Sequence, residues 1–337
     1  MKKQLALVAL AVLASVGVQA QEKVLNLYSA RHYQTDEKLY DNFTKQTGIK
    51  INRIEGKEDE LMERIRNEGA NSPADVFITV DAARLGNADA LGLFAPVKSK
   101  VLDSRIPAHL HTDTWFAFST RARVIIYNRN AVKAEDVATY ESLADPKLKG
   151  KVCSRSGSHP YNLSLVASLI AHDGEAKTEE WAKGVVANFA RAPKGGDTDQ
   201  IKSVALGECG VAVSNTYYLA RLIRSDKVDE RRMMERVGIV WPNQADRGTH
   251  INISGAGMVK TAKNPEAAVK FLEYLASDEA QRYFADGNNE WPVVAGAATG
   301  NPALDAMGRF KADTLSIGTL AKNVAAAQKL LDRAGYR

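Results

Sequence analysis

Two adjacent tyrosines, Tyr217 and Tyr218, stand where a short β-branched run ends and an amphipathic helix is expected to begin. The first turn of a helix has free backbone N–H groups and carries the positive end of the helix dipole, so it favours anions. Two phenols placed there could ionise together. A single Tyr-Tyr pair is more often one core residue beside one surface residue, so chemistry at this pair depends on what the rest of the chain brings to it.

Tyrosines follow two other strand-like runs in the same way. Tyr33 comes after the run Val24–Tyr28 and stands beside His32, and Tyr161 comes after Val152-Cys153 and a Ser-Gly-Ser turn. Open α/β sheets bind ligands beyond the carboxyl ends of their strands. Three separate strand-to-helix turns therefore place phenols where such sheets bind ligands. A shared binding site is a better interpretation of these tyrosines than a core residue beside a surface residue.

Phenolate is a hard anionic ligand, and a small trivalent cation such as Fe³⁺ is the hard acid that suits it. A free phenol has a pKa near 10, so binding at neutral pH needs the charge of the metal and of helix N-termini to drive the protons off. Three phenolates would neutralise Fe³⁺. A fourth phenolate, or a bound anion, would leave negative charge that Arg31, Arg121 or Arg123 could offset. Arg121 and Arg123 lie two apart on an extended run and should share one face, although a solvated strand would carry the same pair.

Zinc binding and catalysis have less support. The 6 histidines show no HExxH pattern. Cys153 and Cys209 lack CxxC spacing, and in an oxidising compartment we expect them to form a disulfide rather than two free thiols. No GxSxG, SxxK or paired-carboxylate motif accompanies the tyrosines, so we expect a binding protein and not an enzyme.

The first twenty residues have the features of a secretory signal peptide. A lysine pair precedes an apolar run from Leu5 to Val18, and small residues at Val18 and Ala20 predict cleavage after Ala20. The next residue is Gln21 and not a lipid-carrying cysteine, and no later run reaches the roughly 18 apolar residues that span a bilayer. We therefore expect a soluble periplasmic protein whose mature chain does not insert into the membrane.

The charge balance argues against a nucleic-acid partner. Without Lys2 and Lys3, 43 of the 45 basic residues remain, against 40 acidic ones. They are mixed along the chain, without a basic run or an aromatic stacking platform. The remaining chain is longer than one hydrophobic core usually supports, so two lobes are expected, in a protein that we expect to be a monomer.

Strand and helix patterns alternate along the mature chain. The expected elements of its first part are 24–28, 36–45, 49–54, 59–68 and 74–80. This βαβαβ order predicts a parallel sheet. A long extended run over 116–128 is expected to cross between the lobes, and 238–242 to cross back. The predicted fold is α/β with two lobes, each a mostly parallel sheet flanked by helices, and a ligand cleft between them.

The crossings define the expected lobes. Residues 21–115 together with about 241–292 are assigned to the N-terminal lobe. Residues from about 116 to 240 together with 293–337 are assigned to the C-terminal lobe.

At these residues the chain resembles the periplasmic ferric-ion-binding proteins of iron ABC transporters, which have the type II periplasmic binding-protein fold. The matching motifs extend over nearly the whole mature chain. They are Tyr28-Ser29-Ala30-Arg31-His32-Tyr33, Ala74-Asp75-Val76-Phe77, Arg121-Ala122-Arg123-Val124, Tyr161-Asn162 and Asn215-Thr216-Tyr217-Tyr218. The resemblance is closest to a subgroup with a tyrosine-rich site. It implies that the metal is held by His32, Tyr33, Tyr161, Tyr217 and Tyr218.

One position departs from the transferrin-like subgroup of the same family. That subgroup has a glutamate ligand just after the ADVF-type strand, and here the position holds Val80, followed by Asp81. A synergistic anion such as carbonate completes the shell in that subgroup, whereas Tyr33 and Tyr161 could complete it here without one. The resemblance further implies that the lobes close over ferric iron and that an inner-membrane ABC permease receives it.

Two other functions stay open at this point. A type II binding protein for a polyamine, thiamine or an oxyanion would stack its tyrosines on the ligand and would show no colour with iron. A hydrolase or lyase would use the Tyr217-Tyr218 pair as acid and base, which the missing catalytic motifs disfavour.

Overall fold

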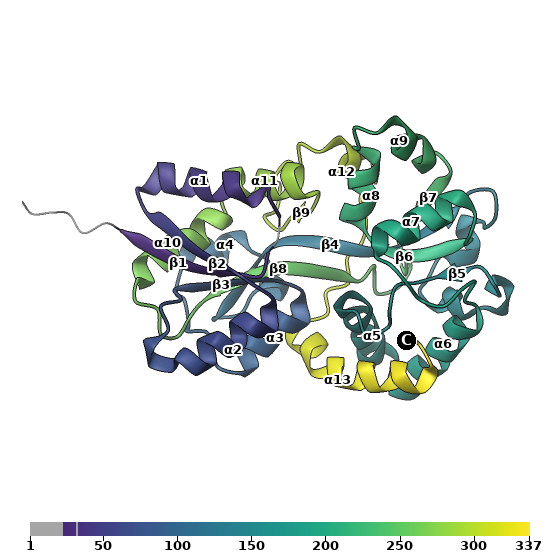
Figure 1. Cartoon of the computed structure of the whole chain (residues 1–337), viewed down its shortest axis with the longest axis horizontal. Coiled ribbons are helices and arrows are strands. Elements are labelled where there is room, and N and C mark those ends of the chain that lie inside the picture. Colours follow the sequence, from purple (N-terminus) through teal and green to yellow (C-terminus); the bar gives the residue numbers. More distant parts are fainter. Residues whose placement is uncertain (1–22, 32) are drawn as a thin grey trace, which may run out of the picture.

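The computed structural model describes residues 23–31 and 33–337 (Figure 1). The predicted signal peptide, its cleavage after Ala20 and the predicted ligand His32 lie outside the described residues. Within the two described ranges, no helix combines enough length with enough apolar character to span a bilayer.

The first lobe is built on three parallel strands, as the βαβαβ pattern predicted. β1 pairs in parallel with both β2 and β3, and every residue of β3 is buried, which accounts for its continuous apolar run. The strands are β1 (Val24–Ser29), β2 (Lys50–Glu55) and β3 (Val76–Val80), and the helices that follow them are α1 (Asp36–Thr47), α2 (Glu58–Glu68) and α3 (Ala82–Ala90).

Two antiparallel strands join the lobes, β4 (Trp115–Asn128) and β8 (Ile251–Met258). The first half of β4 pairs with β8, which pairs in turn with β3. The second half of β4 pairs with β6 (Val211–Asn215) and β7 (Val237–Val240). One sheet therefore runs through the molecule in the order β2-β1-β3-β8-β4-β6-β5, with β7 and β9 also paired to β4. Figure 1 shows β4 and β8 passing between the two lobes.

The prediction that residues 238–242 cross back to the first lobe is wrong. Residues 237–240 form β7, which pairs with the second half of β4 and stays in the second lobe. The strand that crosses back is β8, whose glycines resemble a loop in the sequence. A Cβ atom on Gly257 would lie 2.5 Å from Cδ1 of Phe94 and 2.7 Å from the carbonyl oxygen of Thr114. The glycines of β8 therefore serve close packing and not a turn.

In the second lobe, two parallel strands lead into two helices. β5 (Val152–Cys153) pairs with β6. α5 (Pro160–Asp173) follows β5 and α8 (Thr216–Ile223) follows β6. The C-terminal helix α13 (Ile317–Ala334) packs on α5 and also contacts α3 of the first lobe.

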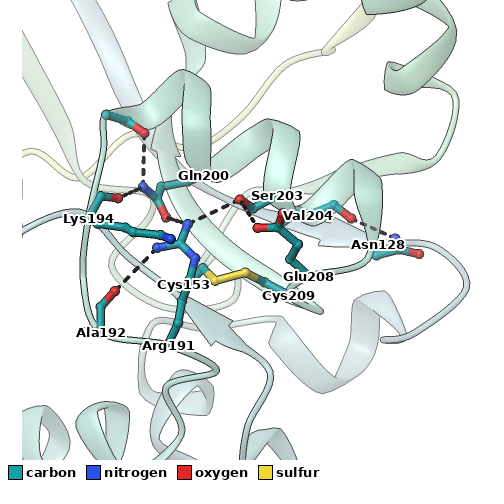
Figure 2. Close-up of a disulfide and its surroundings, with 11 residues drawn as sticks. Asn128, Cys153, Arg191, Ala192, Lys194, Gln200, Ser203, Val204, Glu208 and Cys209 are labelled. Carbon is teal, nitrogen blue, oxygen red and sulfur yellow. Dashed lines mark hydrogen bonds between the residues drawn. A yellow bond between two sulfur atoms is a disulfide. The ribbon is translucent and has the colours of Figure 1, made fainter.

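A disulfide links the starts of the two strand–helix units, β5–α5 and β6–α8 (Figure 2). It joins Cys153 in β5 to Cys209, two residues before β6, with the two Cα atoms 5.8 Å apart. Beside it, the guanidinium of Arg191 donates hydrogen bonds to Oε1 of Gln200 at 3.3 Å and to Oγ of Ser203 at 3.2 Å. The bridge thus sits between elements that lead to Tyr161 and Tyr217.

The α/β class predicted from the sequence is confirmed, and the sheet combines parallel pairs within each lobe with antiparallel pairs at the crossing. The remaining helices and strand are α4 (Lys100–Arg105), α6 (Glu175–Ala187), α7 (Asp197–Leu206), α9 (Val228–Met234), α10 (Pro265–Leu275), α11 (Asp278–Asn288), α12 (Pro302–Ala306) and β9 (Trp291–Pro292). Short 3₁₀ turns lie at Gly69–Asn71, Ala108–Leu110, Ala134–Val137, Glu141–Ala144 and Pro146–Leu148.

Candidate metal centre

The predicted tyrosines stand at the carboxyl ends of three strands. Tyr33 lies between β1 and α1, where its carbonyl oxygen accepts a hydrogen bond from the N–H of Asp36 at 3.0 Å. Tyr161 is the second residue of α5, and Tyr217 and Tyr218 are the second and third residues of α8. The strand-to-helix turns therefore place these phenols as the sequence predicted.

The start of α5 is held by local capping. Pro160 occupies the first helical position, where its missing N–H costs nothing. Nδ1 of His159 accepts the N–H of Tyr161 at 3.2 Å. Burial and the nearby cation of Arg155 lower the pKa of His159 to about 3, so at pH 7 the ring is neutral and can accept this bond.

The four tyrosines converge from both lobes. The phenol oxygens of Tyr161 and Tyr217 are 3.1 Å apart. The rings of Tyr33 and Tyr217 meet edge to face with centroids 6.4 Å apart, and those of Tyr217 and Tyr218 lie 4.1 Å apart. Since Tyr33 belongs to the first lobe and the others to the second, the cluster exists only when the lobes are together.

Burial keeps three of these phenols protonated when no cation is present. It is the largest influence on each, and it raises the pKa of Tyr161 to about 12 and the pKa values of Tyr33 and Tyr217 well above their ordinary value. The charge of Arg121 lowers the pKa of all three phenols, but burial has the larger effect. A cation of high charge would be needed to replace the protons at neutral pH.

Arg121 lies beside the phenols and has unpaired donors. Its side chain is fully buried, and its Cζ lies 5.9 Å from the ring centroid of Tyr161. Nη1 donates to Oγ of Ser254 at 2.8 Å, while Nε and Nη2 are buried without a hydrogen-bond partner among the described residues. Burial opposes its charge, yet Glu290 and the phenols raise the pKa of Arg121. Donors of this kind suit a site that becomes anionic.

The other two predicted arginines form closer pairs with carboxylates than Arg121 does. Arg31 pairs with Asp36 at 2.7 Å, and Arg123 pairs with Asp197 at 2.6 Å. The Cζ of Arg123 also lies 5.9 Å from the ring centroid of Tyr161, so Arg121 and Arg123 share a face as predicted. The alternative of a solvated crossing strand is wrong, because both residues are almost completely buried.

Glu290 is a residue of the site that no sequence motif indicates. It is 0% exposed and accepts hydrogen bonds from Oη of Tyr33 at 3.4 Å and from Oγ of Ser119 at 2.6 Å. Its carboxylate also lies 3.5 Å from the guanidinium groups of Arg31 and Arg121. It comes from the segment before β9, far along the chain from the tyrosine turns, so no spacing pattern points to it.

The charges around the phenols leave a small positive excess. Within the described residues, the buried ion pairs named here and Arg155 bring together four arginines and three carboxylates: Arg31, Arg121, Arg123, Arg155, Asp36, Asp197 and Glu290. No group of three or more histidine, cysteine, aspartate or glutamate side chains in the described ranges could hold a metal ion.

Comparisons with known proteins agree with this chemistry. Residues 38–313 match the family model for bacterial extracellular solute-binding proteins. Iron uptake protein A1 of Synechocystis is 52% identical over 319 residues, which cover 94% of this chain and 88% of that protein.

Two solved structures extend the similarity to the fold. A Trichodesmium protein in complex with iron and citrate ligands has 54% identity and a TM-score of 0.89, over 93% of this chain and 100% of that one. The ferric binding protein from Campylobacter jejuni has 44% identity and a TM-score of 0.86, over the same shares of the two chains. The predicted two-lobed architecture is confirmed by these similarities.

Proposed function

Because this chain belongs to the family of bacterial extracellular solute-binding proteins, we propose that it captures ferric iron between its two lobes and delivers it to an ABC permease. It acts in the periplasm, after removal of the signal peptide, as a monomer without catalytic activity. The observation that carries the proposal is the convergence of four tyrosines from both lobes, with the Tyr161 and Tyr217 oxygens 3.1 Å apart.

The proposed ligands are Tyr33 from the first lobe and Tyr161, Tyr217 and Tyr218 from the second, with His32 as a fifth. Phenolates are hard donors and favour Fe³⁺ over softer or less charged ions. Four phenolates around Fe³⁺ carry one net negative charge, and the surplus arginine charge of the surroundings offsets it. A synergistic anion such as carbonate is therefore not required, although the unpaired N–H groups of Arg121 could bind one.

Capture and release follow from the division of the site between lobes. The proposed lobes are residues 21–115 with about 241–292, and about 116–240 with 293–337, joined through the crossing strands. Separation of the lobes would remove Tyr33 from the second-lobe phenols and open the shell. Protonation of the phenolates, or reduction to the less charged ferrous ion, would favour release at the permease.

A visible spectrum tests the function. Addition of ferric citrate to the iron-free protein should produce a phenolate-to-iron charge-transfer band. The band should weaken in Tyr217→Phe and in Tyr218→Phe, because each variant removes one donor. Tyr127→Phe is the matched control, since Tyr127 lies in the half of β4 that pairs with β7. A colourless wild-type protein without bound iron would refute the proposal, and would leave a polyamine, thiamine or oxyanion as the ligand to be tested.

A further inference from the structure

Each helix that carries second-lobe tyrosines also makes a polar contact with the first lobe away from the phenols. α5 starts with Tyr161 and reaches the first lobe through Ser164, about one turn further along. α8 starts with Tyr217 and Tyr218 and reaches the first lobe through Arg224, the residue that ends the helix. The two contacts therefore sit on the same rigid elements as the proposed ligands.

The first contact is made by a backbone-strained aspartate. Asp81 follows β3 and is 1% exposed. Its Oδ2 accepts hydrogen bonds from Oγ of Ser164 at 2.9 Å and from Nδ2 of Asn252 at 2.7 Å, and its Oδ1 accepts the N–H of Ala83 at 2.9 Å. The φ angle of Asp81 is 111°, which a residue with a side chain rarely adopts. Helix capping does not need this conformation, so the strain points to the contact with the other lobe.

The second contact is made by one guanidinium against the end of α11. Nη1 of Arg224 lies 2.7 Å from the carbonyl oxygen of Asp286 and 3.0 Å from Oδ1 of Asn289. Nη2 lies 2.8 Å from Oδ1 of Asp286. α11 packs on α1 and α10 of the first lobe. The last turn of a helix carries partial negative charge, so a cation from the facing lobe is well placed there.

We propose that these two contacts, Asp81–Ser164 and Arg224–Asp286–Asn289, are latches that hold the lobes together and set how long iron stays bound. This inference rests on the function proposed above. Neither contact touches a phenol, but each must break when its helix moves away from the first lobe. They therefore oppose opening, and act mainly on the rate of iron dissociation.

The test uses the iron-loaded protein and an excess of EDTA, with the loss of the visible band followed in time. Ser164→Ala removes one donor from Asp81 and leaves the bonds from Asn252 and Ala83 in place. Arg224→Gln removes the positive charge and the two guanidinium nitrogens that donate to Asp286 and Asn289. We expect each variant to lose iron roughly threefold to tenfold faster than the wild type, the range expected for one or a few hydrogen bonds.

The double variant should show about the product of the two effects, because the contacts lie on different helices and share no partner. The band itself should keep its position, since the phenols are untouched. A residue that merely supported the site would shift the band. Arg224→Lys keeps the charge and should restore part of the slower release.

Two matched controls stay within one lobe. Oγ of Ser168, one turn beyond Ser164 in α5, donates to the carbonyl oxygen of Leu165 at 2.7 Å. Arg333 in α13 pairs with Glu175 and Glu179 of the second lobe. Ser168→Ala and Arg333→Gln remove similar groups without a contact between lobes, so they should release iron within about twofold of the wild-type rate.

Release from Ser164→Ala and Arg224→Gln at the wild-type rate would overturn the latches while leaving the ferric function intact. If the wild type takes up no iron, the proposed function fails, and solution X-ray scattering of the ligand-free proteins then tests the latches separately. A larger radius of gyration in the double variant than in the wild type would support them. Equal radii would overturn them.

Discussion

At the scale of single residues, the site combines neutral phenols with a fixed set of charges. Burial raises the pKa of Tyr161 to about 12 and that of Tyr217 well above its ordinary value, so both are protonated at pH 7 before metal arrives. Arg121 and Glu290 lie within the same buried layer and hold opposite charges 3.5 Å apart. The surroundings therefore keep a small positive excess without metal, and the phenols become anionic only when a cation displaces their protons.

This exchange predicts the direction of the pH dependence. Each phenol that binds iron must lose its proton, so binding should weaken as the pH falls, by up to about tenfold per pH unit for each ligating phenol. The affinity can be measured by competition with citrate between pH 7 and 9. In Tyr217→Phe the logarithm of the affinity should change by about one unit less per pH unit. An affinity that is independent of pH would contradict phenolate ligation.

At the scale of elements, parallel pairing and close strand contacts position the site. β5 and β6 are parallel neighbours, so their carboxyl ends deliver Tyr161 and Tyr217 to the same edge of the sheet. The crossing strands β4 and β8 bring the first lobe, with Tyr33, to that edge. β8 can lie this close to its neighbours because Gly257 has no side chain: an added Cβ would lie 2.7 Å from the Thr114 carbonyl oxygen.

We therefore expect Gly257→Ala to lower the free energy of unfolding by about 1–3 kcal/mol, the usual cost of overpacking. Thermal unfolding of the iron-free protein measures this effect. The matched control is Gly318→Ala in α13, where an added Cβ meets nothing within 4 Å. There alanine should raise stability by up to about 1 kcal/mol, because it favours helix. Equal unfolding temperatures for the two variants would contradict the packing argument.

At the scale of the whole molecule, a binding site shared between lobes depends on the contacts that hold the lobes together. It also depends on the stability of each lobe. The phenols come from both lobes, and the latches proposed at Ser164 and Arg224 lie at two points of the interface between them. Trp241 and Trp291 pack with their ring centroids 5.8 Å apart. The Cys153–Cys209 disulfide, in contrast, constrains the second lobe and acts mainly on the unfolded chain.

The disulfide closes a loop with a sequence separation of 56 residues. Its removal in the double variant Cys153→Ala, Cys209→Ala should lower the free energy of unfolding by about 4 kcal/mol, because the unfolded chain gains conformational freedom. Urea unfolding measures the change, and the reduced wild type should behave like the variant. Iron uptake under native conditions should persist, since β5 and β6 remain paired. A variant with the wild-type unfolding midpoint would exclude this role.

The sequence by itself determined the order of the first strands and helices, the long crossing strand and the three turns that present tyrosines. These features follow from local periodicity and from residues next to one another in the chain. The α/β class followed from the same alternation of strands and helices. The return crossing could not be recognised, because the glycines of β8 resemble a loop until the side chain of Phe94 is placed against them.

Only the tertiary structure decided which groups meet. It brought the Tyr161 and Tyr217 oxygens to 3.1 Å and placed Glu290 against Tyr33 across 257 residues of sequence. It also gave the three predicted arginines different partners: Arg31 pairs with Asp36, Arg123 pairs with Asp197, and Arg121 lies 3.5 Å from Glu290 with two N–H groups left unpaired. Such pairings depend on distance in space and on burial, which strengthens charge interactions and raises phenol pKa values. Neither quantity can be obtained from spacing along the chain.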